Sequence, residues 1–122
     1  MIITSSSPGQ TKKIGKELAR KILKDPLGQK AKVLALAGDL GAGKTTFLQG
    51  FAKGLGVKGK INSPTFVIMK RFGTFYHLDC CRIQRPEEIL DLGWEEIISD
   101  PKNIVAVEWP ERITSNPSLK SL

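Results

Sequence analysis

Residues 38–47 read GDLGAGKTTF, and this stretch decides the fold. From Gly38 to Thr45 it matches the P-loop pattern GxxxxGKT, in which successive backbone N–H groups surround phosphates and the lysine reaches the outer ones. With glycine near 7% of ordinary usage, the pattern arises by chance in roughly one chain in a few hundred of this size. The stretch therefore predicts a site for a nucleoside triphosphate.

The sequence on either side of this stretch fits the same interpretation. Before it, residues 32–37 (KVLALA) form an apolar run of strand length. After it, Phe47, Phe51 and Leu55 recur every four residues, as on one face of a helix. Phosphate binding requires this order of strand, loop and helix, because the helix N-terminus adds N–H groups and a positive partial charge. The weaker alternative is a glycine-rich turn that carries a surface lysine.

The remaining patterns predict further helices and strands. The predicted helices cover residues 8–24, 86–93 and 95–98. The predicted strands cover residues 65–72, 75–78 and 104–107. Gly73 and Thr74 join the first two strands as an antiparallel hairpin, and the third is wholly apolar, as in a buried parallel sheet. We expect an α/β fold: a P-loop NTPase-like three-layer sandwich with a mostly parallel central sheet, an antiparallel hairpin and helices on both faces.

Length and charge limit the classes of protein. The 122 residues suit a single domain and are too few for a second, substrate-closing domain. No apolar run approaches the roughly 20 residues of a membrane span and the N-terminus does not read as a secretory signal, so we expect a cytoplasmic protein without membrane contact. Residues 1–78 hold fourteen Lys/Arg against three Asp/Glu, and residues 79–122 hold five against nine. The basic half suits nucleic acid or an acidic protein surface, or is a solvated helix face, which is the better interpretation for the first helix.

Carboxylates follow two of the apolar runs and are candidates for a magnesium site. P-loop proteins usually hold Mg²⁺ with the loop Ser/Thr, here Thr45, and with a carboxylate at the tip of a neighbouring strand. Asp79 follows FYHL, and Glu108 follows IVAV. An acidic residue at a strand end is often only a turn former or a helix cap. Two such residues raise the expectation that at least one reaches the metal or its water.

Other polar residues have two interpretations each. In residues 62–66 (NSPTF), Thr65 either senses the third phosphate or belongs to a solvated turn. His77, the only histidine, is expected to be packed and hydrogen-bonded rather than catalytic. For Arg82 a structural ion pair is favoured over a phosphate contact. Trp109 fits the core at least as well as a binding role.

Five stretches keep an order and spacing that one family shares, over about three quarters of the chain. They are GDLGAGKTTF at 38–47, NSPTF at 62–66, YHLDCCR at 76–82, PEEILDLG at 86–93 and VEWPER at 107–112. Together they resemble the bacterial TsaE proteins, small P-loop ATPases needed for threonylcarbamoyladenosine modification of tRNA. The chain differs from the family at Cys81, where a tyrosine is usual. We also expect it to lack the family's C-terminal strands, which complete one edge of the sheet and help to cover the nucleotide.

The resemblance implies roles for individual residues. The phosphates would be held by Gly41, Ala42, Gly43, Lys44, Thr45 and Thr46. Thr45 and Glu108 would bind Mg²⁺, and Asp79 would be an essential acid near the metal and its water. Thr65 would lie in a switch-like loop, and Thr11 would lie close to the nucleotide base. The catalytic roles would belong to Lys44, Asp79 and Glu108.

The resemblance also implies a function. The chain would bind and hydrolyse ATP with Mg²⁺ and act as a nucleotide switch on TsaB and TsaD, the latter being the subunit that modifies adenosine 37 of tRNA. Because the sequence shows no lid and no second domain to exclude water, we expect hydrolysis to be slow alone and dependent on these partners. We expect contact with tRNA to be indirect or weak. Two alternatives stay open: a small-molecule P-loop kinase, although no lid-sized insertion follows Leu55, and a non-hydrolysing ATP-dependent assembly module. A GTP switch is disfavoured because the chain has no N-K-x-D segment to read guanine.

Overall fold

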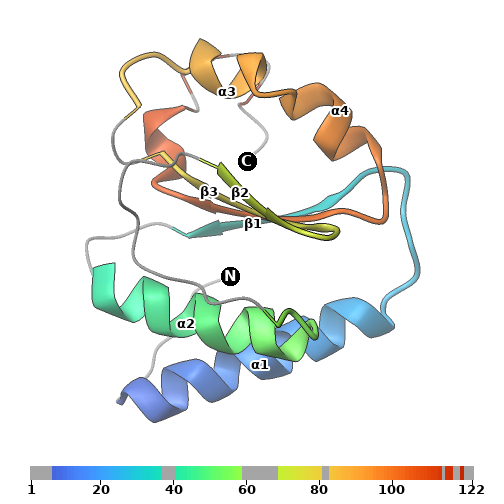
Figure 1. Ribbon diagram of the computed structural model, residues 1–122, viewed down its shortest axis with the longest axis vertical. Helices are drawn as coiled ribbons and strands as arrows, with labels where there is room; N and C mark the ends of the chain where they lie inside the picture. Colours follow the sequence, from blue (N-terminus) through green and yellow to red (C-terminus); the bar gives the residue numbers. More distant parts are fainter. Residues whose placement is uncertain are drawn as a thin grey trace. The chain divides into compact units, whose positions relative to one another are not determined.

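The computed structural model describes residues 7–36, 41–58, 69–80, 83–113, 115, 116 and 119. Their elements are α1 (Pro8–Lys24), β1 (Lys32–Leu36), α2 (Gly41–Gly54), β2 (Met69–Phe72), β3 (Phe75–Asp79), α3 (Glu87–Asp91), α4 (Trp94–Ser99), β4 (Ile104–Glu108) and the short 3₁₀ helix η1 (Pro110–Arg112) (Figure 1). They fall into two compact units: α1 and α2 form one, and the strands with α3, α4 and η1 form the other. Among the described residues, no helix combines the length and the hydropathy that a membrane span requires. That the whole chain is one domain stays a prediction.

Helix α1 begins and ends where the sequence predicts. Ser7 is its N-cap, and the Ser7 hydroxyl accepts a hydrogen bond from the Gln10 N–H at 3.2 Å, which satisfies one of the donors exposed at the helix start. Pro8 follows at the first helical position, where its missing N–H costs nothing. At the other end, Asp25 has extended backbone angles because a residue before proline, here Pro26, avoids the helical region.

Helices α1 and α2 pack closely through glycines. A Cβ on Gly50 would overlap the carbonyl oxygen of Lys12, and a Cβ on Gly54 would lie 2.6 Å from the carbonyl oxygen of Lys16. Gly15 of α1 likewise has no room for a Cβ against the α2 backbone. The contacts advance in the same order along both helices, so α1 and α2 run in the same direction and their N-termini lie at the same end of this unit.

The second unit contains a mixed sheet with strand order β1-β4-β3-β2. Strand β4 pairs in parallel with both β1 and β3, and β2 pairs with β3 as an antiparallel hairpin that turns at Gly73, where φ is +65°. The wholly apolar run at 104–107 therefore lies in a central parallel strand, as predicted. The α/β class and the mostly parallel sheet with one antiparallel hairpin are confirmed.

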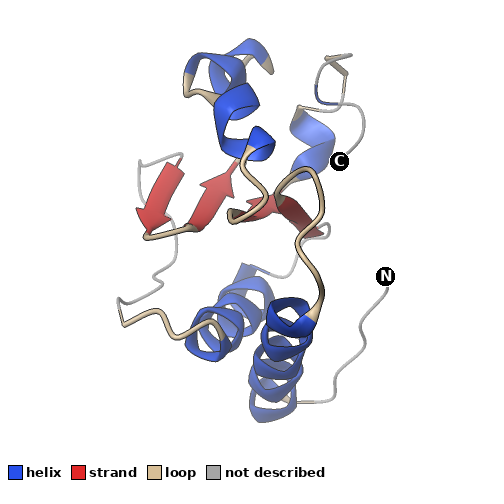
Figure 2. Ribbon diagram, turned by 90° about the vertical axis from the view of Figure 1, so that its right-hand side faces the viewer, coloured by secondary structure: helices blue, strands red, loops and turns tan. Residues whose placement is uncertain are grey.

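The two faces of the sheet differ in chemistry. Side chains alternate along a strand, so Tyr76 and Leu78 of β3 share one face with Val105 and Val107 of β4. This face carries the apolar core of the unit, which includes residues of α3 and α4, the helices drawn above the strands in Figure 2. The opposite face carries the polar residues His77, Asp79 and Glu108, all of them buried.

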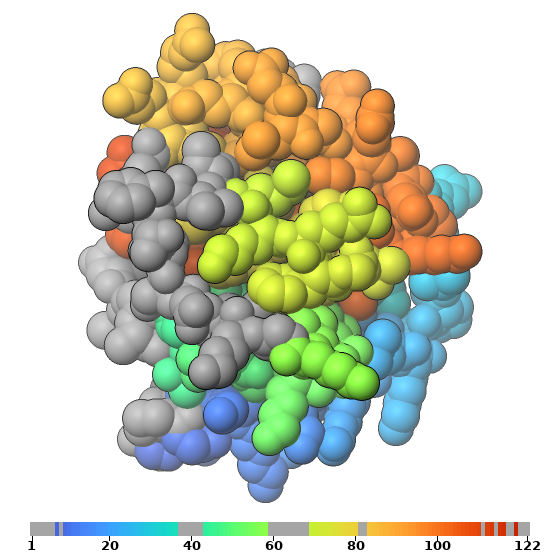
Figure 3. All heavy atoms as spheres, viewed as in Figure 1, coloured from blue at the N-terminus to red at the C-terminus, as the bar shows by residue number. Residues whose placement is uncertain are grey.

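The described sheet has two edge strands. On β1, Val33 is 37% exposed, which is unusual for a valine in a parallel sheet. On β2, which forms part of the surface seen in Figure 3, Arg71 is exposed, and its guanidinium lies 5.3 Å from the centre of the Tyr76 ring. Charged side chains on an edge strand disfavour pairing with another chain.

Candidate functional site

The predicted P-loop sequence leads into the N-terminus of α2. Lys44 lies in the first turn of this 14-residue helix and is only 8% exposed, and this turn contains no acidic residue. A cation at the positive end of a helix dipole is unfavourable in an isolated helix. The arrangement becomes favourable when an anion meets both the lysine and the N–H groups of the first turn. This end of α2 therefore has the chemistry of a phosphate site.

The other predicted nucleotide contacts divide into described and undescribed residues. Gly43 is exposed, and Thr45 and Thr46 are half-buried, all within the first two turns of α2. Thr11 lies at the same end of this unit, and its hydroxyl donates to the Ser7 carbonyl oxygen at 3.0 Å. For Gly41 and Ala42 the structure gives the helical backbone alone.

Thr65 and the rest of the predicted switch-like loop at 62–66 lie outside the described residues. So do Cys81, where the chain differs from the family pattern, and Arg82, which the sequence offered as a structural or phosphate-binding cation. Their predicted roles stay predictions.

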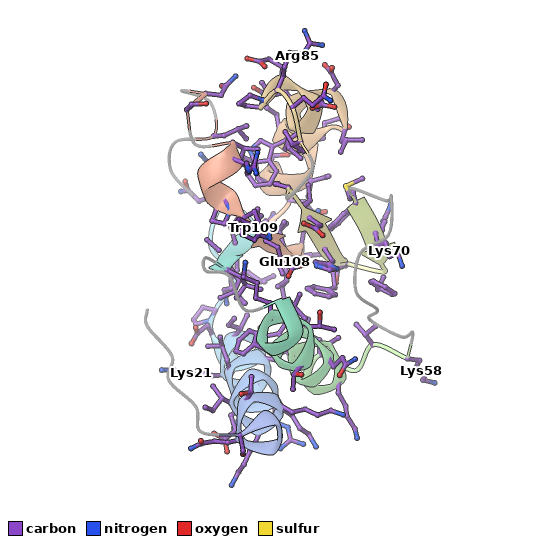
Figure 4. The ribbon with its side chains drawn as sticks, turned by 90° about the vertical axis from the view of Figure 1, so that its left-hand side faces the viewer. Lys21, Lys58, Lys70, Arg85, Glu108 and Trp109 are labelled. Atoms are coloured by element: carbon purple, nitrogen blue, oxygen red, sulfur yellow. The ribbon has the colours of Figure 1, made fainter. Side chains whose placement is uncertain are left out.

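In the second unit, the two candidate carboxylates end neighbouring parallel strands. Glu108 is the last residue of β4 (Figure 4). Asp79 is the last residue of β3, and the sheet register places it opposite Glu108. Asp79 is 8% exposed, and Glu108 is 4% exposed. Ligands of open α/β sheets bind at the carboxyl ends of the strands. The structure thus brings together the two acids that the sequence could only name separately.

Glu108 has a partner that the sequence did not identify. The Nε2 atom of His77, which is 6% exposed, lies 2.8 Å from Oε2 of Glu108. The prediction that His77 is packed and hydrogen-bonded is confirmed, but its partner is one of the candidate metal ligands. The H-x-D spacing does place His77 and Asp79 on one face of a strand. It does not reveal that β4 lies beside that strand.

Trp109, directly after Glu108, has a backbone conformation that is rare for a bulky residue. Its φ of 58° lies in the left-handed region, and its N–H donates to the Leu36 carbonyl oxygen at 3.2 Å. The side chain packs against the core of the second unit, as the core interpretation predicts. Backbone strain of this kind often occurs at functional sites. Pro110 gives only a partial signal, because proline disfavours the right-handed helical region before it without selecting the left-handed one.

The available donors fit magnesium in chemical type. In the second unit, Asp79 and Glu108 offer carboxylate oxygens, the hard ligands that Mg²⁺ prefers. Within the part of the chain that the structure describes, no group of three or more His, Cys, Asp or Glu side chains is placed to hold a metal. Magnesium is usually bound by one or two carboxylates together with substrate phosphates and water, so the pair Asp79 and Glu108 is of a kind that it can use.

Comparison with known proteins points to one family. The sequence profile described as "Threonylcarbamoyl adenosine biosynthesis protein TsaE" matches residues 5–121. The chain is 46% identical over 94 residues to the tRNA threonylcarbamoyladenosine biosynthesis protein TsaE of a Nostoc species, covering 70% of this chain and 57% of that protein. It is 40% identical over 111 residues to the protein of the same name from Bacillus subtilis, covering 88% of this chain and 65% of that protein.

A solved structure agrees with this result. The crystal structure of Bacillus subtilis YdiB matches with a TM-score of 0.67 and 34% sequence identity, over 91% of this chain and 65% of that one. The chain thus spans less than two thirds of the length of these relatives. With the P-loop sequence leading into α2 and the paired acids at the ends of β3 and β4, these matches show that the chain belongs to the TsaE family of threonylcarbamoyl adenosine biosynthesis proteins.

Proposed function

We propose that this chain binds ATP with Mg²⁺ and hydrolyses it slowly, as a nucleotide switch that acts on a TsaB–TsaD complex during threonylcarbamoyladenosine modification of tRNA. The relatives that it matches are named tRNA threonylcarbamoyladenosine biosynthesis proteins. The nucleotide, the metal, the hydrolysis and the partners are our proposal for this chain.

One observation carries the proposal. A lysine is buried in the first turn of α2, at the positive end of the helix dipole, and that turn has no acidic residue. Burying a charge is costly unless an opposite charge or hydrogen-bonding groups compensate for it. Phosphate oxygens supply both to Lys44 and accept hydrogen bonds from the backbone N–H groups of the same turn.

The paired acids support the metal-dependent part. Asp79 and Glu108 supply carboxylates for Mg²⁺, and the P-loop hydroxyl of Thr45 is the customary additional ligand. When bound, the metal neutralises charge that develops on the phosphates. The protein's own task is to hold the phosphates, place the carboxylates and limit the access of water.

We expect hydrolysis to be slow without partners. Phosphoryl transfer is accelerated mainly by positioning and electrostatics, and an arginine supplied by a partner is worth roughly 10³–10⁵ in rate. No lid-sized insertion follows Leu55 in the sequence, so a TsaB–TsaD surface is our candidate for completing the site. A switch of this kind changes its affinity for partners according to the nucleotide it holds.

The binding part is tested with a fluorescent ATP analogue and two lysine variants. Lys44→Ala should weaken binding by about 10- to 100-fold, because a charge-assisted hydrogen bond contributes about 1.5–3 kcal/mol. Lys53→Ala is the matched control, because Lys53 is exposed in the last turn of the same helix. Thermal unfolding of both variants separates lost binding from lost fold, which matters because Lys44 is buried. Equal affinities of the two variants for the analogue would contradict the phosphate role of Lys44.

The switch part is tested by phosphate release at saturating ATP and Mg²⁺, with and without a purified TsaB–TsaD pair, alongside tRNA modification in the same mixture. We expect slow release by the chain alone and a higher rate or repeated rounds of modification with the pair. Rapid release that the pair leaves unchanged would favour the kinase alternative. Binding without any hydrolysis, with modification still supported, would favour the non-hydrolysing module.

A further inference from the structure

The hydrogen bond of Glu108 does not follow the register of the sheet. Glu108 of β4 lies opposite Asp79 of β3. His77 lies opposite Ala106, and both are two residues earlier in their strands, on the same face of the sheet. Yet the Glu108 carboxylate contacts the His77 ring, with Oε2 2.8 Å from Nε2. The glutamate side chain therefore reaches diagonally back along β3 toward His77, away from the carboxyl end of the strand.

This diagonal contact has an electrostatic consequence. Two carboxylates directly opposite each other on neighbouring strands repel, and burial of both, as here, strengthens the repulsion. The imidazole draws one oxygen of Glu108 to the side, so the two acids of the pair are not equivalent. An ionised carboxylate only accepts hydrogen bonds, so His77 donates from Nε2 whenever Glu108 is ionised, as a metal ligand must be.

We infer that His77 is a positioning residue for the metal site: it fixes the Glu108 carboxylate through Oε2 and leaves the Oε1 oxygen as the one that would bind magnesium. This inference rests on the proposed function. It assigns a role to the only histidine, which the family resemblance left without one. Partners that orient a metal ligand through a hydrogen bond typically change metal affinity or activity by 10- to 100-fold when they are removed.

The alternative is a purely structural role. His77 is buried, and its hydrogen bond would stabilise the sheet whether or not a metal binds. The two roles predict different results for metal affinity, because a structural histidine affects unfolding alone. The choice of replacement side chain separates them further, since glutamine can place an amide N–H near the position of Nε2, whereas asparagine is too short and leucine has no donor.

The experiment compares His77→Gln, His77→Asn and His77→Leu with the unchanged chain. The main measurement is the Mg²⁺ concentration that gives half-maximal binding of the fluorescent ATP analogue. A second measurement is the thermal midpoint of the nucleotide-free chain. The same His77 changes are also made in a Glu108→Gln background, so that effects transmitted through Glu108 can be recognised. Where hydrolysis is measurable, kcat and KM are recorded at fixed ATP while Mg²⁺ is varied.

We expect His77→Leu and His77→Asn to raise the half-maximal Mg²⁺ concentration by about 10- to 100-fold. His77→Gln should keep the half-maximal Mg²⁺ concentration near that of the unchanged chain. In the Glu108→Gln background, His77→Leu should not change this concentration further. A lower thermal midpoint with an unchanged half-maximal Mg²⁺ concentration would overturn the inference. Equal effects of His77→Gln and His77→Asn on the half-maximal Mg²⁺ concentration would also overturn it. This comparison can be made even when His77→Leu does not fold. Failure of the unchanged chain to bind the analogue would instead refute the proposed function itself.

Discussion

Gly50→Ala should destabilise the unit of α1 and α2, although alanine favours a helix interior by about 1 kcal/mol over glycine. The new Cβ would overlap the carbonyl oxygen of Lys12 and lie 2.7 Å from its carbonyl carbon and 2.9 Å from its Cα. All three are backbone atoms, so no side-chain rotation relieves the overlap and the two helices must separate. Overpacking of this kind costs typically 1–3 kcal/mol, and the backbone contacts place this case near the upper end.

Subtracting the gain in helix propensity from a steric cost of about 3 kcal/mol leaves a net loss of about 2 kcal/mol in the free energy of unfolding. For a chain of this size that corresponds to a fall of roughly 8 °C in Tm. The assay is urea and thermal unfolding followed by circular dichroism.

Gly9→Ala is the matched control for this prediction. Gly9 also lies in α1, but a Cβ there would have nothing within 4 Å, so the same chemical change should stabilise the chain by up to about 1 kcal/mol. The two variants should therefore move Tm in opposite directions. The reasoning is refuted when Gly50→Ala is as stable as Gly9→Ala, because that result requires the helices to be farther apart than the structure places them.

Two further predictions concern helix termini. Ser7→Ala should lower the free energy of unfolding by about 1 kcal/mol, because the Gln10 N–H loses its capping acceptor; equal urea midpoints would contradict it. For Glu88, the N–H groups of Arg85 and Gln84 donate to Oε2 at 2.9 Å each and lower the pKa of the carboxyl. A lowered folded-state pKa stabilises the chain above the ordinary glutamate pKa of about 4.3, and this contribution is lost as the pH falls through the folded-state pKa. The difference in Tm between the unchanged chain and the Glu88→Gln variant should therefore be full at pH 7 and shrink below about pH 4. A difference that does not change with pH would refute the role of these hydrogen bonds to the carboxylate.

Local patterns predicted most of the elements. The start of α1 at Pro8, the wholly apolar run at 104–107 and the Gly73 turn each have a cause within a few residues, and each appears in the structure as predicted. Gly50 gave a partial signal, because a glycine inside a helix often marks close packing. The sequence does not indicate which backbone would approach it.

The contacts within the candidate site were harder to predict because they depend on strand order. Asp79 and Glu108 were both candidates, but no local pattern shows that β3 and β4 are neighbours. The His77–Glu108 hydrogen bond depends on that neighbourhood and on the register. The left-handed conformation of Trp109 also depends on tertiary structure, since its N–H bonds to the end of β1.

The place of β4 in the sheet has a consequence for folding during synthesis. β4 is the last strand of the described sheet to leave the ribosome, yet β1 and β3 both pair with it. Until Ile104–Glu108 is made, the hairpin of β2 and β3 is the one strand pair that these four strands can form, and an isolated hairpin is marginally stable in water. β1 is synthesised long before β4 and stays unpaired until β4 is available. Pairing of strands so far apart in the sequence is slow, because the intervening chain must first be closed into a loop. The described sheet is therefore completed only when its central strand β4 is added. A ribosome that pauses before β4 would hold a nascent chain in which β1, the first strand to be synthesised, is still unpaired.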